Sequence, residues 1–172
     1  MIWRLALAGL LTACAPVQSP QPTNSDVGAL QAIGLFQEVC LATAPEFLAA
    51  ERRMAAGGLT VATSAGALED PSGALSAKVQ DRAGRNGISV RRCSIVFDDT
   101  DYAGALEELV EILQTNDLQT SPPQRALIGS REVTVWDIRI GGRAGRVTLI
   151  PAKSRALRGG VYLDIPQTVG AA

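Results

Sequence analysis

The C-terminal third of the chain constrains the fold most, because three β-type segments follow one another there with short glycine-rich breaks. The segments span residues 133–140, 146–150 and 161–165, and they are rich in Val and Ile. Gly141-Gly142 and Gly159-Gly160 stand between them, and such pairs supply turn conformations at low steric cost. The pattern predicts a three-stranded antiparallel meander, with Trp136, in phase with Ile138 and Ile140, facing the core.

The N-terminal part of the chain has helical spacing instead. Thr43-Ala44-Pro45-Glu46 resembles a capping box and predicts a second helix, which Gly57-Gly58 would end. The two helices are expected to be short and antiparallel. The first helix rests on apolar residues recurring at steps of three and four: Val27, Leu30, Ile33, Phe36, Val39 and Cys40.

Strands are expected in the middle of the chain at 59–62, 75–80 and 88–97, with a turn over 81–87. The apolar alternation of 88–97 changes phase, which predicts a β-bulge near Arg91-Arg92. A third helix should begin after the acidic run 98–101, capped by Asp99 or Thr100, and 114–124 reads as a polar crossover loop. The fold class predicted is α+β: two N-terminal helices packed on an antiparallel sheet, a third helix, then the C-terminal three-stranded meander.

The first residues have the form of an export leader. Arg4 precedes a short apolar run, and Leu11-Thr12-Ala13-Cys14 matches a lipobox, so the leader resembles that of a bacterial lipoprotein. The resemblance implies a signal peptide at 1–13, lipid attachment at Cys14 and, because Ala15 is not acidic, residence at the periplasmic face of the outer membrane. A transmembrane helix needs about 20 apolar residues, more than the run provides. Ordinary secretion, or a buried helix with Cys14 as a core thiol, remain the alternatives.

Residues 14–26 contain three prolines and almost no large apolar side chain, which predicts a lipidated N-terminus followed by a flexible tether. A single α+β domain is then expected over 27–166, and a disordered tail over 167–172. If Cys14 carries lipid, Cys40 and Cys93 are left as an even pair in an oxidising compartment, and we expect a disulfide between them. Two free buried thiols are the alternative.

The residues that could carry chemistry exclude several classes of function. The chain has no histidine, which removes Ser–His and Cys–His catalysis and the commonest transition-metal ligand. The net charge of −1 and isolated arginine pairs argue against nucleic-acid binding. Asp98, Asp99 and Asp101 lack the glycine and the later glutamate of a calcium loop and are interpreted as helix-capping residues. Six arginines in the C-terminal third could form a weak basic face: Arg131, Arg139, Arg143, Arg146, Arg155 and Arg158.

These observations predict a protein without catalytic residues, metal or cofactor. The leading hypothesis is a membrane-anchored periplasmic lipoprotein, held in the lipid bilayer through acylated Cys14, that acts as a non-enzymatic accessory or interaction module for another envelope protein. The alternative is a small-ligand binding domain of the cell envelope, with its pocket between the sheet and the N-terminal helices. An enzyme is the third hypothesis.

Overall fold

The domain combines helices with one antiparallel sheet, in line with the predicted α+β class. The computed structural model describes residues 26–83, 88–116, 118–154 and 156–167. The leader, Cys14 and all of the predicted tether except Asp26 lie outside the described residues. The elements, in chain order, are α1 (Asp26–Phe36), the π-helical turn η1 (Gln37–Leu41), α2 (Ala50–Ala56), β1 (Val61–Ala62), β2 (Leu68–Glu69), β3 (Leu75–Ala83), β4 (Ser89–Phe97), α3 (Tyr102–Thr115), β5 (Gln119–Thr120), β6 (Gln124–Ile128), β7 (Arg131–Ile140), β8 (Arg143–Ile150) and β9 (Gly159–Pro166).

The sheet has nine strands, more than the sequence pattern predicts, in the order β1-β2-β3-β4-β9-β8-β7-β5, with β6 also paired to β7. All strand pairs are antiparallel. Strands β7, β8 and β9 are consecutive neighbours, so the predicted C-terminal meander is confirmed, although Gly159 and Gly160 begin β9 instead of forming a turn. The last strand, β9, lies between β8 and β4 and thereby joins the meander to the earlier strands.

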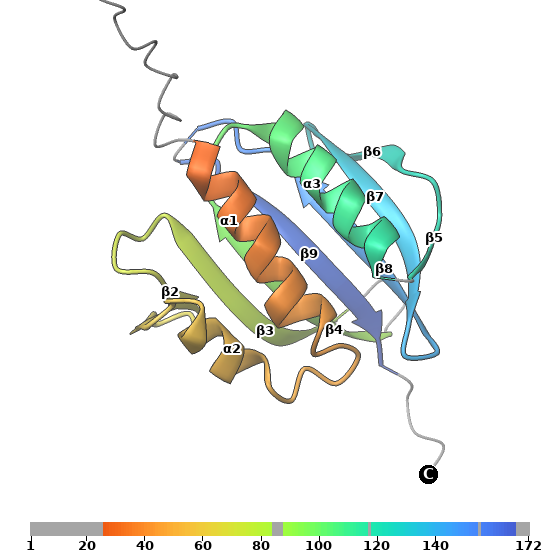
Figure 1. Ribbon diagram of the computed structural model, residues 1–172, viewed down its shortest axis with the longest axis horizontal. Coiled ribbons are helices and arrows are strands. Elements are labelled where there is room, and N and C mark those ends of the chain that lie inside the picture. Colours follow the sequence, from red (N-terminus) through yellow and green to blue (C-terminus); the bar gives the residue numbers. More distant parts are fainter. Residues whose placement is uncertain (1–25, 84–87, 117, 155, 168–172) are drawn as a thin grey trace, which may run out of the picture.

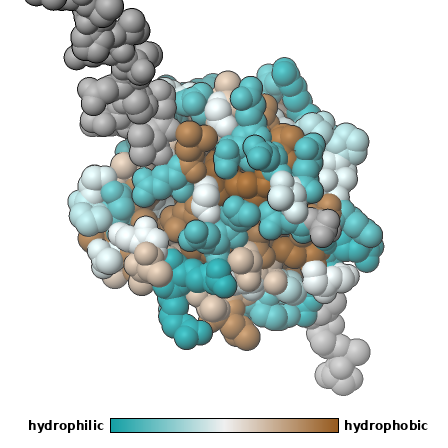
Figure 2. All heavy atoms as spheres, viewed as in Figure 1, coloured by the Kyte–Doolittle hydropathy of each residue, from teal (hydrophilic) through white to brown (hydrophobic). Residues whose placement is uncertain are grey.

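The helices lie on one face of the sheet (Figure 1), and the core lies between the two layers. Figure 2 shows that hydrophobic side chains are interspersed with hydrophilic ones on this side of the molecule. Alternate residues of the central strands point toward the helices and are buried. They include Cys93 and Ile95 on β4, Leu163 on β9, Val147 on β8 and, as predicted, Trp136 on β7.

The second helix differs from the prediction, because α2 is only seven residues long and begins at Ala50. The proposed capping box does not form. The Thr43 hydroxyl donates backwards to the carbonyl of Val39, and the Glu46 carboxylate pairs with Arg143 at 2.8 Å. Phe47 has a positive φ of 54°, which a continuous right-handed helix does not permit. A turn therefore replaces the first part of the predicted helix, and α1 with η1 is the main helical segment before the sheet.

The predicted β-bulge near Arg91-Arg92 is wrong. The pairing of β4 with β3 and with β9 runs through these residues without an inserted residue. The change of phase in the sequence arises because Ile88, 47% exposed, precedes the strand, and Val90 faces away from the helices. Within 89–97 the alternation is regular: Cys93, Ile95 and Phe97 face the helices, and Val90 lies on the opposite face of the sheet.

Smaller differences concern the connections. The segment 114–124, interpreted as a loop, contains β5 and the first residue of β6, and strand 59–62 is reduced to Val61–Ala62. Strand β3 runs to Ala83, into the segment predicted as a turn; residues 84–87 lie outside the described part. Gln167, assigned to the tail, donates its backbone N–H to the Ser89 carbonyl at 2.8 Å. Residues 168–172 also lie outside the described part.

Two glycines provide a matched test of the packing. An added Cβ at Gly159, the first residue of β9, would lie 2.7 Å from the backbone nitrogen of Ala152 and 3.0 Å from the carbonyl oxygen of Ile150, whereas one at Gly34 in α1 would meet nothing within 4 Å. We expect Gly159→Ala to destabilise the domain by about 1–3 kcal/mol through overpacking against backbone. Gly34→Ala should stabilise it by up to about 1 kcal/mol because alanine favours the helix. Urea denaturation measures both, and equal midpoints for the two variants would contradict this packing.

Candidate interaction surface

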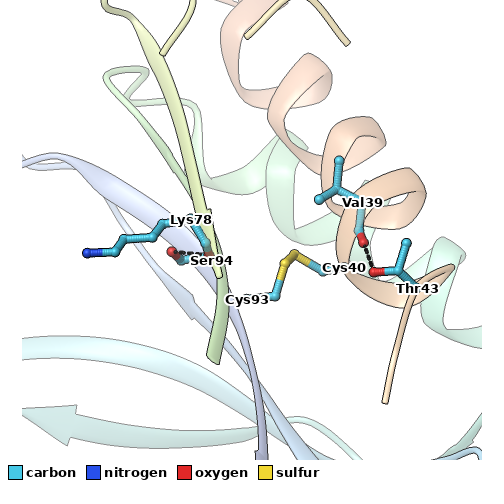
Figure 3. The surroundings of a disulfide bond; sticks show 6 residues. All are labelled: Val39, Cys40, Thr43, Lys78, Cys93 and Ser94. Carbon is cyan, nitrogen blue, oxygen red and sulfur yellow. Dashed lines mark hydrogen bonds between the residues drawn. A yellow bond between two sulfur atoms is a disulfide. The ribbon is translucent and has the colours of Figure 1, made fainter. Parts of the chain in front are cut away.

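The disulfide predicted between Cys40 and Cys93 is present, and it fixes which face of β4 points toward the helices. The two Cα atoms are 5.6 Å apart, and both side chains are fully buried. Figure 3 shows Cys93 reaching toward η1, whereas Ser94 and Lys78 extend from the other side of the strands. The Ser94 hydroxyl donates to the Lys78 carbonyl at 3.2 Å. The disulfide thus joins the helical layer to the sheet at its centre.

The sheet face opposite the helices, here called the open face, combines charged and polar side chains with valines such as Val96 and Val135. No helix covers it within the described part of the chain. One row of side chains crosses five neighbouring strands in register and alternates in charge beyond its first member: Gln80 on β3, Arg92 on β4, Asp164 on β9, Arg146 on β8 and Asp137 on β7. Opposite charges placed directly across antiparallel strands favour this register.

Arg92 is the central residue of the open face. Its Nε and Nη2 atoms each donate to one oxygen of Asp164 at 2.6 Å, forming a bidentate pair of about one-quarter exposure. The hydrogen bond to Asp164 raises the pKa of the Arg92 guanidinium, against the opposing effect of burial. Planar, two-point pairing of this kind holds both side chains in one geometry. The central part of the open face is therefore held in place before any partner arrives.

Tyr162 lies beside this pair. Its ring packs over Gly160, where an added Cβ would lie 2.6 Å from the Tyr162 hydroxyl oxygen, and the Arg92 guanidinium carbon is 5.0 Å from the ring centroid. Burial raises the pKa of the Tyr162 hydroxyl, although nearby arginines act in the opposite direction. The arginine over the aromatic ring is flanked by buried Ser94 and Thr148, and together they make a surface of mixed character. Tyrosine and arginine are enriched in protein–protein interfaces.

The acidic run is structural, as predicted, but the roles differ from those expected. Asp101, not Asp99 or Thr100, caps α3, accepting from the Gly104 amide at 3.0 Å. Asp99 accepts from the amides of Asp101 at 2.9 Å and of Ala29 in α1 at 3.1 Å. Asp98 pairs with Arg158 at 2.5 Å. Within the described ranges no group of three or more candidate ligands gathers to hold a metal ion.

The arginines of the C-terminal third do not form a continuous basic face. Arg143 and Arg146 pair with Glu46 and Asp137, and Arg158 pairs with Asp98. Arg131 donates through Nη2 to three backbone carbonyls in the segment 151–158. The Gly141-Gly142 segment is a hairpin turn between β7 and β8, as the sequence indicates. Arg155 lies outside the described residues.

Space for a small ligand is limited. Core side chains fill the layer between the helices and the sheet. Two open hollows measure about 210 and 190 Å³; the first lies between α3 and β5, and the second beside α2 and β3. Ligand sites usually occupy about 300–1,000 Å³. The open face is therefore the better candidate for a functional surface than either hollow.

Sequence reasoning did not identify the open face. The alternation of polar and apolar residues in the strands contains a signal for it, and the Asp137–Arg146 pair follows from the predicted meander. The pairing of Arg92 with Asp164 depends on β4 lying beside β9, residues 72 positions apart, which no local pattern indicates.

No protein-family model matches the chain, and no curated protein matches it either.

Proposed function

We propose that the chain is a bacterial lipoprotein, anchored through acylated Cys14 at the periplasmic face of the outer membrane, and that it binds another envelope protein without catalysing a reaction. The open face is the observation that carries the binding role. It carries a row of charged side chains, is held by the Arg92–Asp164 pair, and is free of helices in the described part of the chain.

The cellular location proposed here draws on two features. The leader resembles that of bacterial lipoproteins, and a buried disulfide suits an oxidising compartment such as the periplasm. Among the described residues, no helix is long and apolar enough to cross a membrane. Acylation of Cys14 with several chains would provide stable attachment, because each buried methylene contributes about 0.8 kcal/mol.

A charge reversal on the open face tests the binding role. Arg82 is exposed, lies on β3 in phase with Gln80, and forms no salt bridge within the described residues. We expect Arg82→Glu to reduce, by about tenfold, recovery of the partner that co-purifies with the chain from membranes, because a like-charge contact costs on the order of 1 kcal/mol or more. Quantitative mass spectrometry of the pull-down measures this recovery.

Arg52→Glu is the matched control. Arg52 is an exposed arginine on α2, on the helical side of the domain, and the substitution makes the same change of charge. Recovery with this variant should equal that of the wild type. Equal losses from both variants, or from neither, would remove the open face as the binding surface.

A further inference from the structure

Three large apolar side chains are exposed on two neighbouring segments at one end of the sheet. Leu127 is 74% exposed and Ile128 is 52% exposed, both at the end of β6, and Leu157, before β9, is 52% exposed. Ile128 pairs with Arg131, whose Nη2 donates to the Leu157 carbonyl at 3.0 Å. The two segments are therefore adjacent. Leu127, Ile128 and Leu157 are named the apolar tip.

The described chain begins at this same end. The Ala29 amide of α1 donates to Asp99, which follows β4 by two residues, and Phe97 at the end of β4 pairs with Gly159 at the start of β9. In Figure 1 the start of α1 lies beside the connection that leads into β9. The twelve residue steps from Asp26 back to Cys14 start here and can span about 37 Å at about 3.1 Å per residue.

The chemistry of the apolar tip suits the interfacial region of a bilayer. Leu157 donates its backbone N–H to the Ser154 carbonyl, and its own carbonyl accepts from the Lys153 amide, both at 3.0 Å. The backbone groups of Leu157 are therefore already hydrogen-bonded when its side chain enters the bilayer. Unpaired backbone groups are what the hydrocarbon region excludes. Lys153 is exposed beside it and can reach lipid phosphates while apolar side chains enter the acyl boundary.

We propose that this end of the domain rests on the phospholipid bilayer, with the apolar tip inserted at the boundary between the lipid headgroups and the acyl chains. The inference rests on the proposed lipid anchor and adds the orientation of the anchored domain. The opposite end of the sheet, where the loop of Pro45 packs against the Gly141 turn, then points away from the membrane. The strands of the open face run between the two ends, so that face stays accessible to a partner from the side.

Tryptophan substitution tests the orientation, with a matched control at the far end. Leu127→Trp marks the apolar tip, and Leu48→Trp marks the loop containing Pro45, where Leu48 is 89% exposed. Each mature chain, processed and acylated at Cys14, is reconstituted into vesicles of phosphatidylethanolamine and phosphatidylglycerol with brominated acyl chains, which quench nearby indole fluorescence. Trp136 is buried in the core and contributes the same background to both variants.

The Leu127→Trp chain is expected to lose emission in brominated vesicles relative to unbrominated ones and to shift toward the blue. The Leu48→Trp chain should show neither change. Unchanged Leu127→Trp emission, or equal quenching of both variants, overturns the proposed orientation. Flotation separates the two proposals: a wild-type chain that floats with vesicles, beside a Cys14→Ala chain that does not, supports the anchor whatever the quenching shows. If the wild-type chain does not float, the anchor and the orientation both fail.

Discussion

Replacing Cys40 and Cys93 together with alanine is expected to lower the free energy of unfolding by about 4 kcal/mol. The bond joins residues 53 positions apart, so its loss releases a long loop in the unfolded chain. Cys40 on η1 and Cys93 on β4 are both fully buried. The disulfide between them joins the helical layer to the centre of the sheet. For a domain of this size the melting temperature should fall by on the order of 10 °C.

Calorimetry of the double variant and of reduced wild-type protein measures this effect. The reduced protein keeps both sulfur atoms, so a similar loss in the two samples assigns the effect to the cross-link rather than to the packing volume of the side chains. A double variant that melts with the wild type would show that the bond contributes nothing to stability. Rapid labelling of both thiols in native, unreduced protein would show that it does not form.

The parts of the fold that local sequence patterns predict are those built from neighbouring segments. Strands β7 and β8 are joined by the Gly141-Gly142 turn, in which both residues have positive φ, and their Val and Ile residues alternate regularly. The third helix was found for a similar reason, because a line of apolar residues at helical spacing follows a run of capping residues. In each case contacts within about fifteen residues determine the structure.

The parts that local patterns did not predict depend on distant contacts. Strands β1, β2 and β5 have two residues each, too few for a period to be recognised. The second helix was expected to begin near Thr43, but Phe47 adopts a positive φ and Glu46 pairs with Arg143 on β8, a contact across 97 positions of sequence. Tertiary packing here overrides a local capping pattern.

The candidate surfaces divide in the same way. The disulfide could be predicted because the proposed lipid attachment at Cys14 leaves two other cysteines, and only one pairing of two is available. The row of charged side chains on the open face could not be predicted, because it forms only when β4 pairs with β9. The apolar tip unites Ile128 with Leu157 through Arg131, and sequence alone gives no reason to place those residues together.

Membrane attachment through Cys14 is the central claim, and incorporation of a radiolabelled fatty acid into the chain expressed in a Gram-negative host tests it most directly. The lipobox thiol is the expected acceptor, so the wild-type chain should carry label and fractionate with the outer membrane. Cys14→Ala should lose the label completely and remain an uncleaved or soluble precursor. The Cys40→Ala, Cys93→Ala double variant should keep its label, since those cysteines are bonded to each other. Equal label in the wild-type and Cys14→Ala chains would contradict the lipoprotein assignment.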